Sequence, residues 1–443
     1  MSTGMNNGAT TMVAEESSYG SVDPTDARAL DTTALQALTW YSLRVTQDSF
    51  AAGASSLKMP TDERADVTLA GGRQPLRVLT AVDASGPVRS ISGDVPLSME
   101  ARGMGANLPS ATGLGVLLAS GLGLIQQTAG AAVTGTYVTP NTFSVPSAGV
   151  IYPGDIVAVT QPDGTLRAVK ASDVSGLNVV TTVEPHGIPA AGSATVRLCH
   201  QYYIASDAVP SGGSVAAQYA PRDGYDTILA VGGRVAKVDI AAGGTGAVDI
   251  VVTVRFGDGQ YQMSTTVAPT EPLLIGAAGS TALRTRVAPV LVTADHSSDS
   301  APYSGTATAF PVREWSVSIE LDLVPVSDQG TRSRMSDMRV SSATLSGSMT
   351  VDSPNSFAAD LREWLRSSQK RGVGFAAAGA NAAGNGCGIW VGSVEPSEDP
   401  GYTFAPNDRT QVVSFRAGDY AGDGSSTTPT DAANTPWVLW FVA

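Results

Sequence analysis

Histidine and cysteine, whose side chains often act as proton-transfer groups, nucleophiles or metal ligands, are rare in this chain, which has three histidines and two cysteines. His296 follows Asp295 in a serine-rich stretch, which has the composition of a Ser–His–Asp triad. Adjacent residues in a Ser/Asp loop do not orient one another as a triad requires, so we interpret them as turn residues. Cys199 and His200 are half of a zinc ligand set, but no second Cys or His pair lies at a ligand spacing. We expect a strand end with a buried thiol there.

Two other stretches contain the residue types of a reactive site. The glycines of "AAGGTGA" (241–247) suggest a phosphate-binding loop, but no Lys-Ser/Thr pair follows them, so a hairpin turn explains them better. The carboxylates of "DERAD" (62–66) could form an acid/base pair, although such a charge run is more typical of a solvated loop. The sequence therefore predicts no catalytic residues, no metal site and no cofactor, and a protein that is not an enzyme.

The charge balance limits the partners of the chain. Its 443 residues include 27 Lys or Arg and 40 Asp or Glu, which gives a net charge of −13. Nucleic-acid binding requires stripes of Lys and Arg, so this balance excludes ordinary DNA binding, but not a conduit through which DNA slides. Charged residues make up only 15% of the chain, against about 25% in typical soluble proteins. We therefore expect neighbouring molecules to cover much of the surface.

Length and targeting signals bound the class further. The chain is long enough for two or three domains, because single cores stop growing at about 250 residues. Two cysteines far apart in the sequence indicate synthesis in a reducing compartment. The first residues lack the basic start and apolar core of a signal peptide, and "GLGVLLASGLGLI" (113–125) is too short and glycine-rich to span a bilayer. We expect neither signal-peptide secretion nor a membrane anchor.

Two segments have the pattern of β-ribbons. In "RVAKVDIAAGGTGAVDIVVTVRFG" (234–257), two alternating apolar runs flank a glycine turn, which predicts a hairpin with one core face and one semi-polar, wet face. A similar run, turn and run recurs at 388–418 with a longer connection. In the first ribbon the alternation puts one set of residues on one face and a second set on the other: Val235, Lys237 and Asp239 against Ala236, Val238 and Ile240.

The expected elements follow the same order in the two halves of the chain: strand, polar loop, strand, helix and two-stranded ribbon. In the first half they are 38–50, 51–94, 95–103, 110–122 and 234–257. In the second half they are 312–325, 326–339, 340–351, 353–370 and 388–418. The helix at 353–370 has the best start signal, with Ser353 as N-cap and Pro354 at the first position. The shared order predicts a duplication.

Residues 140–200 differ from both halves in their pattern of strands and turns. Short Val-rich runs alternate with Pro-Gly-Asp, Pro-Asp-Gly and Pro-His-Gly turns, which is typical of a small β barrel or sandwich; one long, decorated hairpin is the alternative. The sequence thus predicts five parts: an N-terminal arm (1–22), a discontinuous first domain (23–139 and 201–260), an inserted small β domain (140–200), a linker (261–310) and a second domain (311–443).

Three stretches carry a resemblance to a known family: "AEESSYGSVDP" (14–24), "VPLSMEARGMGANLPSATGLGVLLASGLG" (95–123) and the ribbon at 234–257. In these three stretches the chain resembles the tail tube proteins, or major tail proteins, of tailed bacteriophages. The resemblance implies a mainly β fold, with tandem tail-tube β-sandwich or barrel domains that each have a flanking α-helix, plus the small inserted β domain. It covers most of the chain except the 140–200 insert.

The resemblance also implies an assembly. Rings would stack into a tube that conducts DNA into the host, and the ribbons would line its lumen through Arg234, Lys237, Asp239, Asp249, Thr253, Arg255, Gln411, Ser414 and Arg416. The loop 51–94, with Asp62, Glu63, Arg64 and Asp66, and the arm 1–22 would reach the adjacent ring. Two tube domains per chain favour a trimeric, pseudo-hexameric ring, and a single domain would require a hexamer.

Its expected partners are further copies of itself, a tape measure protein, and the tail terminator and distal tail proteins. The resemblance further implies that DNA would pass without specific binding, that no membrane would be involved, and that the protein would be made in the bacterial cytoplasm and end in the virion tail. The insert is expected to project outward, because about sixty residues inside the bore would block it. Two other classes remain open: a capsid or virion decoration protein, and a secreted adhesin or carbohydrate-active β protein.

Overall fold

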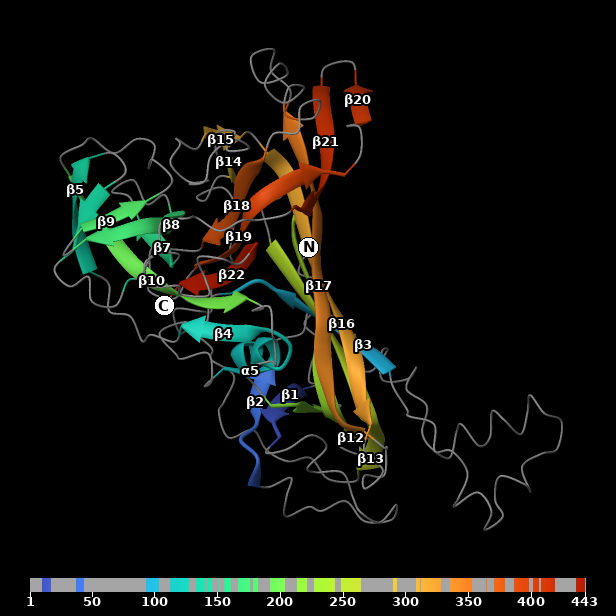
Figure 1. Cartoon of the computed structure of the whole chain (residues 1–443). Helices are drawn as coiled ribbons and strands as arrows, with labels where there is room; N and C mark the ends of the chain where they lie inside the picture. The colour runs from blue at the N-terminus through green and yellow to red at the C-terminus, as the bar shows by residue number, and fades with distance from the viewer. Residues whose placement is uncertain are drawn as a thin grey trace, which may run out of the picture.

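The structure is a computed structural model of the whole chain, shown in Figure 1. It describes residues 10–16, 37–43, 93–102, 112–126, 133–139, 142–145, 151, 155–160, 166–175, 178–181, 192–203, 213–220, 227–243, 248–263, 290–292, 308–310, 312–327, 335–352, 364, 370–378, 386–397, 401–405, 408–418 and 436–442.

The protein is mainly β, as the sequence predicts, and its largest unit is an antiparallel sheet of seven neighbouring strands, which we call the long sheet. In spatial order they are β3 (Gly93–Glu100), β13 (Val248–Met263), β12 (Thr227–Ala242), β16 (Val312–Ser327), β17 (Met335–Asp352), β21 (Asp408–Ala417) and β20 (Gly401–Ala405). The strands expected at 95–103, 312–325 and 340–351 are β3, β16 and β17. Figure 1 shows the long strands running along one side of the molecule.

The two halves of the chain meet inside the long sheet. β12 and β13 form the ribbon that the sequence predicts, and β12 continues sideways into β16, from Lys237↔Glu320 to Ala242↔Trp315. One pairing corresponds in the two halves, because β3 pairs with β13 as β17 pairs with β21. In each half, therefore, the strand before the expected helix pairs with the second strand of the ribbon. The first two expected strands do not correspond: β16 pairs with β17, whereas β2 (Tyr41–Leu43) is not paired with β3 among the described strands.

The second expected ribbon, 388–418, forms only in part. β19 (Gly386–Pro396) pairs with β21 at residues 394–396, and backbone hydrogen bonds from Gly418 to Ser393 and from Ser397 to Ser414 extend this contact. The hairpin partner of β21 is β20. The rest of β19 pairs with β18 (Arg371–Ala378) and β22 (Trp437–Val442). The physical reason is burial: residues 386–394 of β19 are all buried, so this run is covered on both faces and does not alternate.

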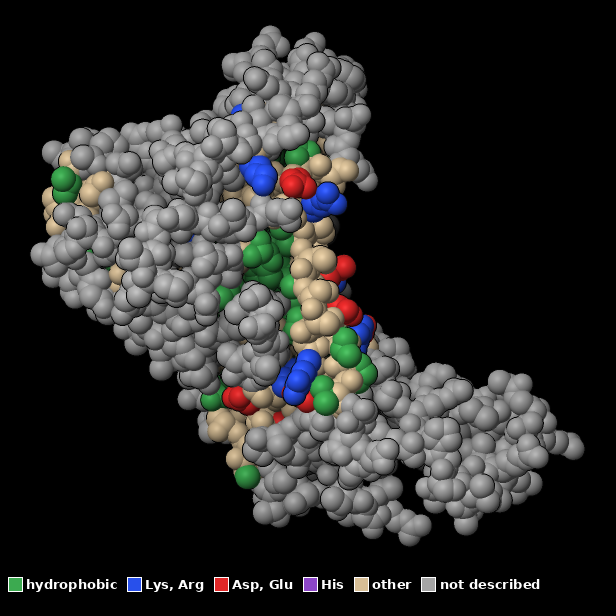
Figure 2. All heavy atoms as spheres, in the orientation of Figure 1, with side chains coloured by type: hydrophobic (Ala, Val, Ile, Leu, Met, Phe, Trp, Pro, Cys, Tyr) green, Lys and Arg blue, Asp and Glu red, His purple; other side chains and the backbone are tan. Residues whose placement is uncertain are grey.

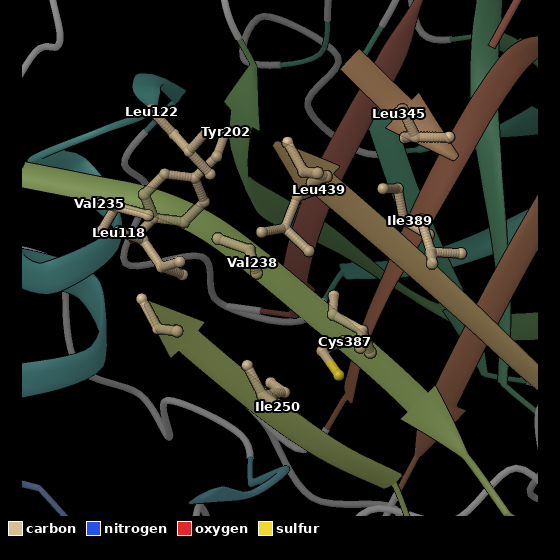
Figure 3. Packing of buried hydrophobic residues seen from close by; sticks show 14 of the residues in the cluster. Leu118, Leu122, Tyr202, Val235, Val238, Ile250, Leu345, Cys387, Ile389 and Leu439 are labelled. Carbon is tan, nitrogen blue, oxygen red and sulfur yellow. The ribbon is translucent and has the colours of Figure 1, made fainter. Parts of the chain in front are cut away.

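The β18–β19–β22 layer packs against the buried face of the long sheet. Rings from both layers meet, with the centroids of Trp315 and Phe375 5.0 Å apart and those of Phe375 and Phe415 5.6 Å apart and stacked. Figure 3 shows side chains from both layers converging there, among them Val238, Ile250 and Ile389. One buried cluster contains residues of both halves, so the halves share a core. The edge of this layer continues through β14 (Val290–Val292) to β15 (Thr308–Phe310), both within the expected linker.

A short helix and the N-terminal strands close the first-half end of the core. The helix expected at 110–122 is α5 (Gly113–Ala119), capped by the Thr112 hydroxyl, which accepts from the Gly115 N–H at 3.1 Å. Gly121 allows a close approach to the long sheet, because a Cβ there would lie 2.6 Å from Cβ of Val235. The helix expected at 353–370 lies outside the described residues except for Trp364, which is helical, and Lys370.

The N-terminal arm, expected to be loose and to reach a neighbouring ring, contains a strand of the protomer's own sheet. β1 (Thr10–Glu15) pairs between β2 (Tyr41–Leu43) and β11 (Val215–Ala220). Met12, Val13 and Ala14 are buried, which explains why these residues stay with the protomer. Glu16 completes the attachment by accepting from the Ser214 hydroxyl at 2.8 Å.

The described strands from residue 133 to residue 203 form a closed ring of six, which contains the expected insert (140–200) but begins before it, with β5 (Val133–Thr139). In order around the ring they are β5, β6 (Thr142–Ser144), β9 (Asn178–Thr181), β8 (Leu166–Ser175), β7 (Ile156–Thr160) and β10 (Ser193–Tyr203). β10 leaves the ring at its C-terminal end, where it pairs with β22 and β4 (Gly123–Gln126). The ring shares a buried cluster with Trp390 and Trp440, so it is packed onto the β18–β19–β22 layer. In Figure 1 it lies on the side of this layer away from β16 and β17.

In the described part of the chain, no helix combines the length and the hydrophobicity of a membrane span.

Candidate functional site: the polar face of the long sheet

Side chains alternate strictly between the two faces of the long sheet over most of its strands. On β16, Val317, Ile319 and Leu321 are buried, whereas Ser318 and Glu320 between them are half-buried or exposed. β13, β3 and β17 alternate in the same way over much of their length. We call the outward-facing set the polar face. Figure 2 shows part of it as a strip of backbone and polar side chains, with interspersed blue and red groups, along the long strands.

The antiparallel register arranges the polar face in rows that cross the sheet. Side chains that are opposite one another on neighbouring strands lie on the same face and are in contact distance. One row crosses six strands: Ser98, Val251, Asp239, Ser318, Ser346 and Arg416. The next row is Glu100, Asp249, Ala241, Ser316, Ser348 and Ser414. Small hydroxyl side chains therefore occupy the middle of the face, and the Oγ atoms of Ser316 and Ser348 are 3.0 Å apart.

Three basic groups of the polar face are each held by a carboxylate. Lys237 Nζ lies 3.2 Å from Oδ1 of Asp239 and 3.3 Å from Oε1 of Glu320. Partial burial lowers the pKa of Lys237, but hydrogen bonds and attraction to these two carboxylates outweigh it, so the pKa is raised.

The other two basic groups lie nearer the margins of the sheet. Arg255 Nε donates to Oδ1 of Asp94 at 2.8 Å, and this hydrogen bond raises the pKa of Arg255. Arg416 Nη2 donates to Oε2 of Glu395 at 3.3 Å. The positive charges of Lys237, Arg255 and Arg416 are thus already satisfied within the protomer.

Two carboxylates face each other across β3 and β13. Glu100 and Asp249 are directly opposite in the register. Partial burial raises the pKa of Asp249, and repulsion from Glu100 raises it further. Glu100 also accepts a hydrogen bond from Arg102 Nη2 at 2.8 Å.

Most of the sequence-predicted lumen residues lie on the polar face, but two do not. Those on the face are Lys237, Asp239, Asp249, Thr253, Arg255, Ser414 and Arg416. Arg234 and Gln411 are buried, so the prediction that they lie on the exposed face is wrong. Whether any of them lines a channel stays a prediction. Asp62, Glu63, Arg64 and Asp66 lie outside the described residues.

The two corrections have local causes. In β12, the register shifts between Val235 and Lys237, so Ala236 is bulged and Val235 faces the core. The expected placement of Val235 beside Lys237 is therefore wrong. Arg234 is opposite Arg255 in the register but is buried, with its guanidinium donating to Asp337 and to the backbone oxygen of Ser120. Gln411 shares its alternation with Val413 and Phe415, which face the core.

The site residues that sequence reasoning missed are those of β16 and β17. Both strands were expected, but their outward residues were not assigned to the face: Ser316, Ser318, Glu320, Ser346 and Ser348. The alternation of Ser and Glu with Val and Ile along 316–320 is a signal that could have found them.

The two thiols among the described residues are buried and lie apart. Cys199 and Cys387 are buried free thiols that belong to different clusters, and burial raises the pKa of both, to about 12 for Cys387. Such thiols are not nucleophilic near neutral pH. Among the described residues, no group of three or more His, Cys, Asp or Glu side chains could hold a metal ion. His200 is buried next to Cys199, and His186 and His296 lie outside the described residues.

No protein-family model and no curated protein matches the chain. Its class is therefore defined by its fold: a mainly β protein built around a large, open antiparallel sheet.

Proposed function

We propose that the chain is a structural protein of a tailed bacteriophage, which assembles as stacked rings into the tail tube, the conduit for DNA. The observation that carries this proposal is the two-sided long sheet. One face packs on the core of the protomer, and the other presents rows of Ser and Thr with charges that are paired locally. A sheet with one face packed on the core and with unpaired edge strands suits a barrel to which several copies contribute, because closing the barrel pairs those edge strands.

The charges of the polar face suit a channel for a polyanion. DNA binds where Lys and Arg side chains are free to neutralise phosphates and release counterions. On this face Lys237, Arg255 and Arg416 are engaged by carboxylates, and Asp249 adds negative charge. A duplex that passed along this face would meet hydroxyl groups and paired charges, and would not adhere.

The corresponding pairings of the two halves support tandem tube domains. β3–β13 and β17–β21 are equivalent in the order of elements, and the β12–β16 pairing joins one half to the next. A chain with two such units gives a pseudo-hexameric ring from three copies. The inserted ring of strands lies away from β16 and β17, which suits an outward projection that leaves the bore open.

The resemblance supplies the remaining parts of the proposal. A tape measure protein would occupy the lumen during assembly, and terminator and distal tail proteins would bind the two ends. The protein would be made in the host cytoplasm and function in the virion tail.

Electron microscopy of the purified protein tests the function. We expect hollow rods of uniform diameter that lengthen with protein concentration. A virion decoration protein would give isolated trimers or flat lattices instead, and that result would reject the proposal.

A further inference from the structure

A buried carboxylate fastens the end of β1 to two distant parts of the chain. Glu16, which directly follows β1, is only 2% exposed. Its Oε2 accepts hydrogen bonds from the Ser214 hydroxyl at 2.8 Å and from the Gly232 N–H at 3.0 Å. The N–H of Glu16 also donates to the backbone oxygen of Ser214 at 2.8 Å. The N-terminal segment is thus joined to positions 198 and 216 residues further along the chain.

Gly232, one of the two donors to this carboxylate, is a bulged residue of β12. The register of β12 with β11 and its register with β13 both skip Gly232. Its φ of 66° lies in the left-handed region, which favours glycine. A bulged residue is left out of the ladder, and a buried N–H requires an acceptor. Gly232 is buried, and Glu16 supplies the acceptor.

β12 changes its neighbour just beyond this bulge. On one edge, β13 pairs with β12 from residue 227 to residue 242. On the other edge, β11 pairs with residues 228–233 and β16 pairs with residues 237–242. A bulge bends a strand and increases its twist. The bend that Glu16 holds therefore determines how β12 passes from the side of β11 into the long sheet.

β1 is attached to the protomer at few points besides Glu16. It pairs with β2 and β11, and among the described strands it pairs with no strand of the long sheet. Val13 of β1 belongs to the large core cluster, whereas Met12 and Ala14 belong to a small one. Short elements near a chain end open at a lower free energy than core strands. β1 can therefore leave its place while the long sheet stays folded.

We propose that β1 is a strap, latched by Glu16, that closes on the folded protomer and fixes the bend of β12. The closed form holds the ribbon β12–β13 at the angle that assembly requires, and a protomer with an open strap does not assemble. The link to assembly rests on the proposed function, whereas closure of the strap within one protomer does not.

Three variants separate the latch from ordinary contacts. Glu16→Ala removes the buried acceptor. Gly213→Ala keeps the carboxylate but places a Cβ 2.7 Å from the backbone oxygen of Glu16, which obstructs closure from the opposite side. Glu15→Ala is the matched control, because it removes the neighbouring carboxylate, which accepts an exposed hydrogen bond from the Gly213 N–H at 2.8 Å.

Hydrogen–deuterium exchange of the unassembled protein measures closure of the strap. We expect Glu16→Ala and Gly213→Ala each to speed exchange at least about tenfold at 11–14 and at 230–235, with exchange at 316–321 of β16 unchanged. Glu15→Ala should stay within about threefold of the wild type in all three segments. Unchanged exchange at 230–235 in both test variants would overturn the latch. Equally faster exchange at 316–321 would show that β1 is part of the core, which would overturn the strap.

Tube formation by the same variants tests the link to assembly. Glu16→Ala and Gly213→Ala should each raise the critical concentration for tubes at least about fivefold, and Glu15→Ala should leave it unchanged. Tubes from both test variants at the wild-type concentration, despite faster exchange, would overturn this link and leave the proposed function standing. Wild-type protein that forms no tubes would overturn the proposed function and the link together, while the exchange measurement would still decide whether the strap closes.

Discussion

Arg234 of β12 donates a hydrogen bond from Nη2 to Oδ1 of Asp337 in β17 at 2.8 Å, and only 5% of the arginine side chain is exposed. Its Nη1 also donates to the backbone oxygen of Ser120, which caps the C-terminal end of α5, at 3.0 Å. The arginine expected on the wet face is therefore a buried link. It ties the ribbon and helix of the first half to the hairpin of the second.

Removing the two partners of this link should have unequal effects. Asp337→Ala leaves the buried guanidinium without this carboxylate, which should lower the free energy of unfolding by about 3 kcal/mol or more. Arg234→Met leaves a carboxylate that is 27% exposed and can be hydrated, so its cost should be about 1–2 kcal/mol. Urea unfolding of the unassembled protein measures both. Equal costs would show that the arginine is not the group that depends on the pair.

Asp249 should make the protomer less stable as pH rises. Its folded-state pKa is raised by burial and by Glu100, so the folded chain binds this proton more tightly than the unfolded chain. Stability is then greatest below the unfolded pKa of about 3.9 and is lost as pH rises through the raised folded pKa. Asp249→Asn should therefore stabilise the protein at pH 7 by roughly 0.2–1 kcal/mol, with little effect below pH 4.

The matched control for this prediction is Asp239→Asn. Asp239 contacts Lys237 at 3.2 Å, so its loss should be neutral or destabilising at pH 7. Thermal unfolding of the three proteins from pH 3 to 8 gives the comparison. Destabilisation at pH 7 by both substitutions would contradict the role given to Glu100.

Substitution by alanine should destabilise the protein at one glycine and have no effect at another. A Cβ on Gly388 would collide with the backbone oxygen of Phe375 and the ring of Trp440, so Gly388→Ala should destabilise the monomer by about 1–3 kcal/mol. A Cβ on Gly243, at the ribbon turn, meets nothing within 4 Å, so Gly243→Ala should leave the melting temperature of the monomer unchanged.

β-branched residues across Gly243 to Gly246 should impair assembly more than monomer folding. Normal tubes from that variant would count against the ribbon's role in assembly.

Unpaired positive charge on the polar face should make the tube retain DNA. Ser316 and Ser348 are opposite each other in the register, and their other neighbours in that row are Ala241 and Ser414. Tubes of the Ser316→Lys/Ser348→Lys double variant should hold short duplex DNA that resists nuclease and is released by salt. Thr136→Lys, on an exposed position of the inserted ring, should bind DNA only where nuclease reaches it. Nuclease-sensitive DNA on both tubes would place the polar face on the outside.

The sequence predicts the elements better than their partners. The alternation of β13, β16 and the first ribbon is local, and so is the helix start at Thr112, so these elements were expected within a few residues. The pairing of β19 with β18 and β22 could not be predicted, because the sequence of a strand buried on both faces does not indicate which strands lie beside it. β1 was missed for the same kind of reason: its six residues become a strand only through β11 and β2, which lie far away in the chain.

The candidate site shows the same division. Period-two alternation correctly placed Lys237, Asp239 and Arg255 on one face, since no bulge intervenes between them and the ribbon turn. The bulge at Ala236 turned Val235 to the core, and a bulge depends on packing that a single strand does not encode. The burial of Arg234 depends on Ser120 and Asp337, which lie far away in the chain. Ionic contacts between halves, such as that of Lys237 with Glu320, required the β12–β16 junction, which no local pattern reveals.

The most direct test of the central claim is a cryo-electron microscopy map of the polymer formed by the wild-type protein. The account predicts a hollow tube in which Lys237, Ser318 and Ser346 face the bore, and in which the inserted ring of strands faces outward. A map with these three residues on the outer surface, or with the polar face buried between protomers and no bore, would contradict it.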